Sequence, residues 1–130
     1  MDDRRNHLLK LSTDLTDAFN RQNLDDIMKC FSQNAIFEDS SGVRHEGKEA
    51  IRTAFEPLIK GGLGKFRFDL EDFFAEVDTQ KVMISWTLNT DIEGDWKKRR
   101  GMDILRFSGD KIVVKLAYTK AEVPVLENGP

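Results

Sequence analysis

The hydrophobic period of this chain changes once, at a glycine-rich segment, and this change restricts the fold more than any other feature. Before Gly61-Gly62, apolar residues recur every three or four positions, which is the spacing of amphipathic helices. After Gly64, apolar and polar residues alternate, which is the spacing of strands with one buried face. Helices grouped ahead of strands indicate an α+β fold, in which the helices cover one face of a curved antiparallel sheet.

Three helices are predicted before the glycines. Residues 5–21 carry one apolar stripe, so we expect a first amphipathic helix there. A short second helix is capped by Asn23 and ended by Gln33-Asn34. Gly47 precedes the third helix, which Pro57 kinks or ends because proline removes a helical hydrogen bond. The inner face of the second helix is expected to consist of Ile27, Cys30 and Phe31.

Strands make up the rest of the chain. Ile36-Phe37 predicts a short strand that ends in a turn at Ser40-Ser41-Gly42. The alternation slips by one residue near Glu71-Asp72, which predicts a β-bulge and adds curvature. Glu93-Gly94 is typical of a hairpin turn. Four long strands are expected at residues 66–77, 82–88, 96–107 and 111–119.

The length of 130 residues fits a single domain over residues 1–130, with residues 122–130 as a tail. A net charge of -3 does not favour nucleic acid, and the basic run 97–100 is typical of a solvated strand end. No apolar run reaches membrane-spanning length, and the first residues contain no apolar signal core. We therefore expect a cytoplasmic protein that binds neither nucleic acid nor a membrane.

The sequence contains no pattern that would hold a metal or a cofactor, and we expect no cofactor. Its one cysteine, Cys30, lies in an apolar helical pattern and is predicted to be a small core residue. Neither His7 nor His45 forms a Cys-His signature, and no residue cluster has metal-ligand spacing. His45 stays open between an acid or base at a pocket mouth and an exposed residue before a helix.

Several stretches resemble known families. Residues 20–42 resemble the corresponding part of bacterial ketosteroid isomerases, and residues 46–52 resemble the helix entry of SnoaL-like polyketide cyclases. Residues 101–107, followed by 109–113, resemble the last hairpin of both. The chain is thus similar to the nuclear-transport-factor-2-like (NTF2-like) superfamily over residues 8–120. This resemblance implies a cone-shaped fold, in which a curved antiparallel sheet packs against three helices around a hydrophobic pocket.

The same resemblance implies roles for two carboxylates. Asp39 falls where ketosteroid isomerases place the general base that moves a proton between two carbons. Asp103 falls where they place a protonated aspartic acid that donates a hydrogen bond to the oxyanion. The oxyanion tyrosine of those enzymes aligns here with Leu15.

The resemblance also implies which side chains form the pocket wall and bind the ligand. These are Leu15, Phe19, Phe37, Phe55, Phe66, Trp86, Leu88, Leu105 and Phe107. Asp103 shares its strand face with Leu105, but the residues beside it in sequence, Met102 and Ile104, are apolar too. Alternation alone therefore leaves open which face of this strand points inward.

Two registers are open for the last strand. Its two faces are Ile112, Val114, Leu116 and Tyr118 on one side, and Val113, Lys115, Ala117 and Thr119 on the other. In the isomerase-like register the second face lines the pocket, so Lys115 would pair with Asp103 or Asp39. The first face would then be exposed and apolar, and we expect a homodimer through this outer sheet face. The simpler register buries the first face and needs no dimer.

The sequence leaves two classes of function open. One is an isomerase-, cyclase- or lyase-type enzyme that binds a small apolar carbonyl compound and moves a proton with Asp39 or Asp103, without a cofactor. The other is a non-catalytic module that binds an apolar small molecule or dimerises. The leucine at position 15 favours the second class, and Asp39 also fits an ordinary turn residue.

A third alternative is epoxide hydrolysis, as in relatives that resemble limonene-epoxide hydrolase. That reaction uses an Asp-Arg-Asp arrangement around a water. Arg99, Arg100 and Asp103 approach this arrangement in sequence, but the last strand supplies no second aspartate.

Overall fold

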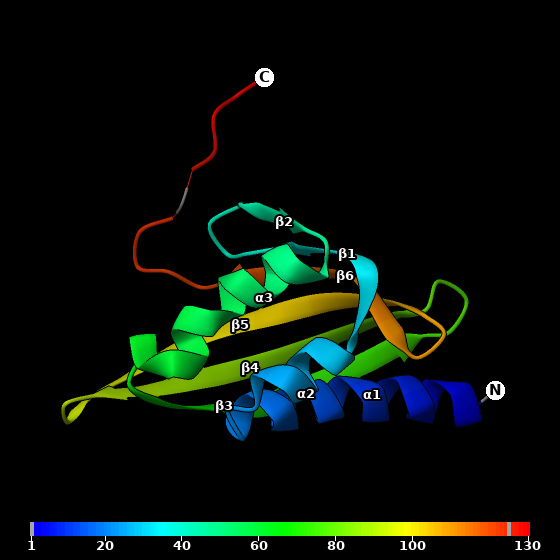
Figure 1. The fold of residues 1–130 in the computed structure, drawn as a ribbon, viewed down its shortest axis with the longest axis horizontal. Coiled ribbons are helices and arrows are strands. Elements are labelled where there is room, and N and C mark those ends of the chain that lie inside the picture. The colour runs from blue at the N-terminus through cyan, green and yellow to red at the C-terminus, as the bar shows by residue number, and fades with distance from the viewer. Residues whose placement is uncertain (1, 125) are drawn as a thin grey trace.

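The structure of the chain is a computed structural model that describes residues 2–124 and 126–130. Within these residues, three α-helices lie over one face of a six-stranded sheet (Figure 1). The helices are α1 (Asp2–Asn20), α2 (Leu24–Lys29) and α3 (Lys48–Pro57), and a short π-helical turn, η1 (Leu58–Gly62), follows α3. The strands are β1 (Phe31–Glu38), β2 (Arg44–Glu46), β3 (Lys65–Glu76), β4 (Lys81–Ile92), β5 (Asp95–Ser108) and β6 (Lys111–Thr119). The predicted α+β class is confirmed.

The strand order β2-β1-β6-β5-β4-β3 places the first and the last long strands side by side. β1 runs parallel to β6, whereas the other neighbouring strands are antiparallel. Parallel neighbours need a long connection, and here the rest of the sheet and α3 lie between β1 and β6 in sequence. This pairing brings the turn after β1, which contains Asp39, beside the C-terminal end of β6.

The predicted bulge in β3 is confirmed. The register with β4 shifts between Leu70 and Asp72, so Glu71 is the extra residue. The Glu71 side chain accepts hydrogen bonds from Arg100, 2.7 Å from Nη2 to Oε2, and from the hydroxyl of Thr87. The Arg100 guanidinium and the Thr87 hydroxyl lower the pKa of Glu71 to about 2.

The predicted extent of the second helix is wrong. α2 ends at Lys29, Cys30 caps it, and Phe31 begins β1, so Gln33 and Asn34 continue a strand instead of ending a helix. The Cys30 carbonyl accepts a hydrogen bond from the Ile112 amide at 2.8 Å, and Phe31 is buried opposite Ile112. Pairing with β6 thus outweighs the local helical pattern. Strand β2 was not predicted either.

The core lies between α1, α2, α3 and the inner face of the sheet. The stripe of α1 that faces the sheet includes Leu8, Leu15 and Phe19. The side chain of Asn20 holds the end of this helix on β3, because it both donates to the Phe68 carbonyl (2.9 Å) and accepts from the Phe68 amide (2.8 Å). These paired hydrogen bonds fix the helix beside the aromatic residues of β3.

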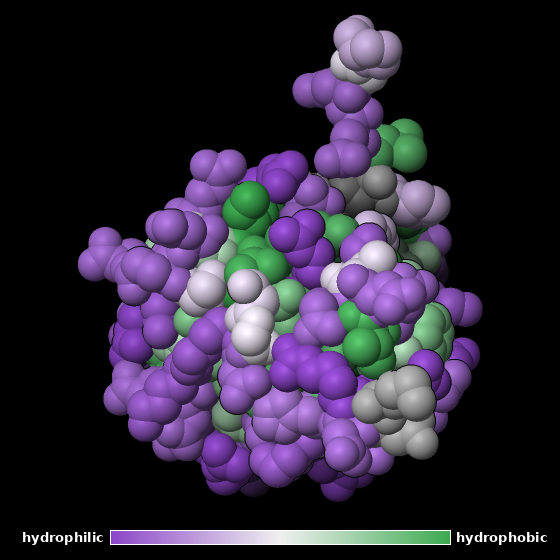
Figure 2. Space-filling view, turned by 90° about the vertical axis from the view of Figure 1, so that its right-hand side faces the viewer, coloured by the Kyte–Doolittle hydropathy of each residue, from purple (hydrophilic) through white to green (hydrophobic). Residues whose placement is uncertain are grey.

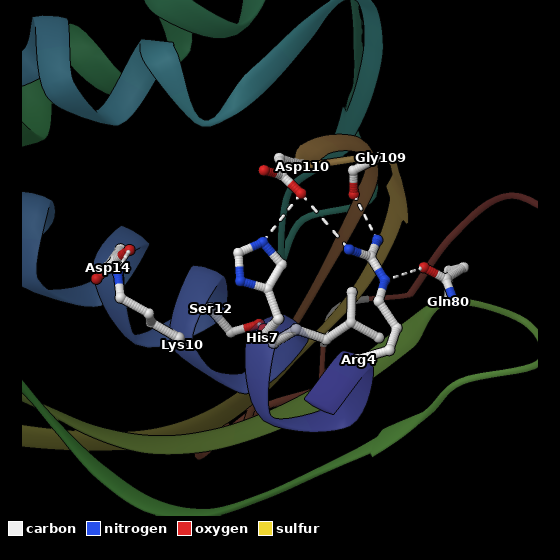
Figure 3. A network of polar contacts seen from close by, with 9 residues as sticks. Arg4, His7, Lys10, Ser12, Asp14, Gln80, Gly109 and Asp110 are labelled. Carbon is white, nitrogen blue, oxygen red and sulfur yellow. Dashed lines mark hydrogen bonds and ion pairs between the residues drawn. The ribbon is translucent and has the colours of Figure 1, made fainter. Parts of the chain in front are cut away.

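The N-terminal end of α1 is held by polar contacts (Figure 3). Arg4 donates to the Gln80 side chain at 2.8 Å and to the Gly109 carbonyl at 2.6 Å, while His7 Nε2 lies 3.0 Å from Asp110 Oδ1. The contact with His7, and secondly that with Arg4, lowers the pKa of Asp110. This end of the molecule is mostly hydrophilic (Figure 2).

Beyond β6, residues 120–124 and 126–130 form no helix or strand, and the end of the chain extends away from the body (Figure 1). The tail was predicted over residues 122–130. Within the part of the chain that the structure describes, no helix has the length and apolar character needed to cross a membrane.

Candidate functional site

A cavity of about 220 Å³ lies between α1, α3 and the inner face of the sheet. Its wall is mainly apolar and aromatic, with a few polar side chains among them. The lining residues are Leu15, Thr16, Phe19, Phe37, Ser40, Ala54, Phe55, Leu58, Phe68, Ile84, Trp86, Leu88, Arg99, Asp103, Lys115, Ala117 and Thr119.

The aromatic side chains of the wall brace one another. Phe55 of α3 lies at the centre, with its ring centroid 5.1 Å from that of Phe19 and 4.8 Å from that of Phe37. On the sheet side, Phe68 meets Trp86 edge to face, with centroids 5.2 Å apart. Contacts of this kind stabilise aromatic pairs beyond the burial of their area, so the wall is largely preformed.

A bulge in β6 decides which residues of that strand enter the cavity. Arg106 pairs with Val114 and Phe107 pairs with Ile112, so Val113 is an extra residue. Ile112 points inward on one side of the bulge, and Lys115 points inward on the other, followed by Ala117 and Thr119. The open choice of register is thereby resolved: Lys115 lines the cavity, and Tyr118 faces outward.

Lys115 meets Asp103 inside this wall. The Lys115 Nζ lies 3.3 Å from Asp103 Oδ1, and each residue is 6% exposed. The same ammonium lies 4.7 Å from the ring centroid of Phe37 and 5.8 Å from that of Phe55. The cation is thus stabilised by one carboxylate and by two aromatic faces.

The Asp103 carboxylate is under-satisfied for a buried group. Its Oδ1 accepts no hydrogen bond from any residue that the structure describes, although Lys115 lies within ion-pair distance. Buried polar atoms nearly always have a hydrogen-bond partner, so an atom without one marks a place where a ligand or water completes the contacts.

Trp86 contributes a second unpaired atom. It is 6% exposed, and its indole Nε1 donates to no side chain or backbone group in the described residues. The ring packs over Gly101 on β5, where a β-carbon would approach ring atom Cη2 to 2.5 Å. Gly101 therefore makes room for the indole in the cavity wall.

Asp39 does not line the cavity, and its oxygens are saturated by its own turn. Oδ1 accepts from the Ser41 hydroxyl at 2.7 Å and from the amides of Ser41 and Val43 at 3.0 and 3.1 Å, and Oδ2 lies 3.0 Å from His45 Nε2. Burial raises the pKa of Asp39, but the hydrogen bonds from Ser41, His45 and Val43 together outweigh it and lower the pKa. The structure thus brings Asp103 together with Lys115, and not with Asp39.

The role of His45 was left open by the sequence. Its ring stacks on that of Phe37, with centroids 5.4 Å apart, and it lies outside the cavity lining. The rim nearby is formed by Ser40 and Thr119, whose hydroxyl oxygens are 2.6 Å apart. The exposed Arg99 also lines the cavity from β5.

Three predicted wall residues lie elsewhere. Leu105 and Phe107 are buried on the Asp103 face of β5, but they lie closer to the β5–β6 turn than Asp103 does. Leu105 pairs with Val82, and both are fully buried, so side chains close the cavity at that level. Phe66 packs beside Phe68, with centroids 6.0 Å apart, and does not reach the lining.

The remaining predicted wall residues line the cavity: Leu15, Phe19, Phe37, Phe55, Trp86, Leu88 and Lys115. Sequence reasoning missed several others. Phe68 and Ile84 share strand faces with predicted residues, so alternation could have found them. Thr16 and Ser40 carried no such signal, because only the tertiary packing brings them to the cavity.

Metal binding has no support from side-chain clustering. Across residues 2–124 and 126–130, no group of three or more His, Cys, Asp or Glu side chains is arranged to hold an ion. Cys30 lies outside the cavity lining, and burial raises the pKa of its thiol, which makes it a poor nucleophile.

The fold is shared with many solved structures of low sequence identity. An NTF2-like protein of unknown function from Mesorhizobium loti superposes with a TM-score of 0.76 at 21% identity, covering 93% of this chain and 97% of that chain. A cystatin-like-fold protein of unknown function from Methylobium petroleophilum PM1 has a TM-score of 0.74 at 19% identity, covering 91% and 80%.

TerC, in a structure co-crystallised with polyporic acid, has a TM-score of 0.74 at 12% identity and covers 88% of this chain and 92% of that chain. No curated protein matches the chain in sequence. The SnoaL-like domain family, however, matches residues 13–115, which is most of the chain and includes both Asp103 and Lys115. The chain therefore belongs to the SnoaL-like domain family, and it shares its fold with NTF2-like proteins.

Proposed function

We propose that this protein binds a small molecule with an apolar body and a carbonyl group, and catalyses a cofactor-free proton transfer beside that carbonyl. The observation that carries this proposal is the buried Asp103–Lys115 pair, whose Asp103 Oδ1 has no hydrogen bond among the described residues. A titratable pair in a mainly apolar cavity is a typical arrangement of an acid–base site.

Asp103 is the general base in this proposal. Asp103 accepts the proton from the carbon next to the carbonyl, while the Lys115 ammonium lies 3.3 Å from its carboxylate. This role differs from the protonated donor that the isomerase resemblance implies. The proton then returns to another carbon or to an oxygen, which gives an isomerase-, cyclase- or lyase-type outcome.

Lys115 is the electrophile. Removing a proton beside a carbonyl creates an enolate, and a fixed cation in a water-poor cavity stabilises the developing negative charge. The two aromatic rings hold the ammonium near Asp103 while the substrate binds. Lys115 thereby takes over the task that a tyrosine performs in ketosteroid isomerases, where this chain has Leu15.

Asp39 has a structural role in the proposal. Its hydrogen bonds hold the turn between β1 and β2, and this turn places Ser40 at the cavity rim. Epoxide hydrolysis receives no support, since Asp103 is the one carboxylate among the described residues of the lining.

A second candidate function is binding without catalysis. TerC crystallises with a small molecule in the same fold, which supports ligand binding as the shared property. Non-catalytic binding also needs an apolar cavity, but it gives no reason to bury an under-satisfied carboxylate beside a lysine.

The outer face of the sheet supports self-association into a homodimer. Phe74 and Tyr118 are 60% and 46% exposed, and they lie on the same face as the partly exposed Met83, Met102 and Ile104. A second copy of the chain would cover this apolar face. Sedimentation of the wild type and of a Tyr118→Glu variant checks this, with a dimer expected only for the wild type.

Deuterium exchange tests the proposed chemistry directly. Acetophenone, 2-acetylnaphthalene and 2-tetralone are incubated with the protein in D₂O, and loss of the α-proton signals is followed by NMR. We expect exchange above the buffer rate with the wild type, and at least a hundredfold slower exchange with Asp103→Asn.

Asp39→Asn is the matched control, and it should exchange the ketones at the wild-type rate. Each variant is first shown to be folded by circular dichroism. Exchange by the wild type at the buffer rate for all three ketones, or unchanged exchange by Asp103→Asn, would reject catalysis and leave the binding function.

A further inference from the structure

Trp86 carries a buried hydrogen-bond donor that the proposed proton transfer does not use. Its indole N–H has no acceptor in the described residues, and the residue is more than nine-tenths buried in the cavity wall. Leaving such a donor unpaired destabilises the fold, and a bound oxygen atom would recover that loss.

The packing of the indole fixes where this donor lies. Phe68 meets the ring edge to face, 5.2 Å between centroids, from the β3 side. Ring atoms Cη2 and Cζ2 lie over Gly101 on the β5 side. Cζ2 and Nε1 are bonded to the same ring carbon, so the N–H lies on the edge of the ring that faces β5, the strand that carries Asp103.

Two buried atoms of opposite character, each without a hydrogen bond in the described residues, therefore belong to side chains that line one cavity. The indole N–H requires an acceptor, and Asp103 Oδ1 requires a donor or an acidic C–H. A carbonyl oxygen next to a proton-bearing carbon or an enol hydroxyl satisfies both at once. A hydrocarbon satisfies neither, and a simple carboxylate offers no donor to Asp103.

The size of the cavity restricts the rest of the ligand. A cavity of about 150 Å³ lined by apolar side chains holds one benzene ring. The volume of about 220 Å³ therefore leaves room within the cavity wall for one or two rings, and not for all four fused rings of a steroid. The phenylalanine-rich wall favours a flat aromatic body over an aliphatic chain.

We infer that Trp86 is a ligand-binding residue whose indole N–H receives the oxygen of an aromatic ketone or its enol, one or two rings in size. This inference rests on the proposed function for the position of the reacting carbon beside Asp103. It adds the substrate class and the role of the Trp86 indole N–H as a hydrogen-bond donor, neither of which the isomerase resemblance supplies.

Indole NMR on the whole protein tests it without disturbing the site. The chain has two tryptophans, and a Trp96→Phe variant assigns the signal of Trp86, because Trp96 is 64% exposed at the β4–β5 hairpin. We expect 2-acetylnaphthalene to move the Trp86 indole proton downfield. The isosteric hydrocarbon 2-isopropenylnaphthalene should leave it near its free position.

Affinities provide the second measurement. We expect Trp86→Phe to bind 2-acetylnaphthalene about tenfold more weakly relative to 2-isopropenylnaphthalene than the wild type does, as the loss of one buried hydrogen bond implies. Trp96→Phe is the matched control and should retain the wild-type ratio. The smaller phenylalanine ring changes the shape of the cavity, but this affects the affinities of both isosteric ligands and therefore cancels in their ratio.

Each outcome separates this inference from the proposed function. An unmoved Trp86 signal with bound ketone, or an unchanged affinity ratio, would overturn the role of Trp86. Binding of a four-ring steroid ketone as tightly as 2-acetylnaphthalene would overturn the size limit. A downfield Trp86 signal without any α-proton exchange would reject catalysis alone and leave the role of Trp86 standing.

Discussion

Asp39 beside His45 and Asp103 beside Lys115 are two pairs of an acidic and a basic side chain with opposite environments. At the turn after β1, Asp39 accepts four hydrogen bonds or close polar contacts, and its side chain is 29% exposed. In the cavity, Asp103 faces Lys115 at 3.3 Å, its side chain is 9% exposed, and its Oδ1 has no hydrogen-bond partner in the described residues.

The comparison shows how the hydrogen bonds and burial of a carboxylate indicate its role. A carboxylate whose oxygens accept all their hydrogen bonds from its own turn stabilises local structure and has no free acceptor site for a ligand. A buried carboxylate with unused capacity is costly to the fold, and it is kept where a bound molecule completes it. By this criterion Asp103, and not Asp39, marks the site.

The largest effect is expected from separating the buried pair. Asp103→Asn leaves the Lys115 cation buried without its partner, and we expect a loss of about 3 kcal/mol in the free energy of unfolding. Urea unfolding followed by circular dichroism measures it. A loss below about 1 kcal/mol would mean that the cavity is wet enough to solvate the lysine, and would weaken the contrast with Asp39.

The matched control is the double variant Asp103→Leu with Lys115→Met. Replacing both charges by apolar side chains of similar length removes the desolvation cost together with the attraction. We expect this variant to be as stable as the wild type or more so, and to have lost ketone binding. Such a result would show that the pair is retained for function.

A smaller, pH-dependent effect is expected at Asp39. The pKa of this carboxyl is lower in the folded protein, so its stabilisation is present above the ordinary carboxyl range and is lost as the pH falls through the folded-state pKa. Asp39→Asn should lose about 1 kcal/mol near neutral pH. The gap between wild type and variant in urea unfolding should close in acid, and a gap that persists there would contradict the assignment.

The smallest effect is expected at Glu71, an exposed counterpart of both pairs. Arg100 and secondly Thr87 lower the pKa of Glu71 to about 2, so its contribution persists until the pH falls towards that value. Glu71→Gln should cost less than Asp39→Asn, and 1 M salt should remove the difference because exposed charges are screened. A salt-independent loss would contradict this.

Much of the fold could be predicted, because period and turn residues act locally. The bulge at Glu71 appeared as a slip in alternation, and the last strand was predicted at residues 111–119, which are the bounds of β6. The end of α2 was missed because Phe31 and Cys30 continue a helical pattern in sequence. Pairing with Ile112, far away in the chain, makes Phe31 a strand residue.

The site was harder to predict for the same reason. Phe19, Phe37 and Trp86 were expected in the wall from the resemblance to a family. The inward direction of Lys115 depends on the bulge at Val113, which leaves no mark in a run of apolar residues. The hydrogen bonds of the Asp39 oxygens depend on the positions of His45 and Val43, which only the folded turn defines.

The bulge at Val113 determines which side chains beyond it in β6 face the cavity. If the same residues paired with β5 in strict alternation, without a bulge, Leu116 and Tyr118 would turn inward and Lys115 would point to the other side. Deleting Val113 would instead straighten the strand and leave the pairs Arg106–Val114 and Leu105–Lys115 as they are, so Lys115 would still line the cavity. A relative that lacks the extra residue therefore needs a gap at this position in an alignment, because otherwise the residues on one side of the gap are assigned to the wrong face of the sheet.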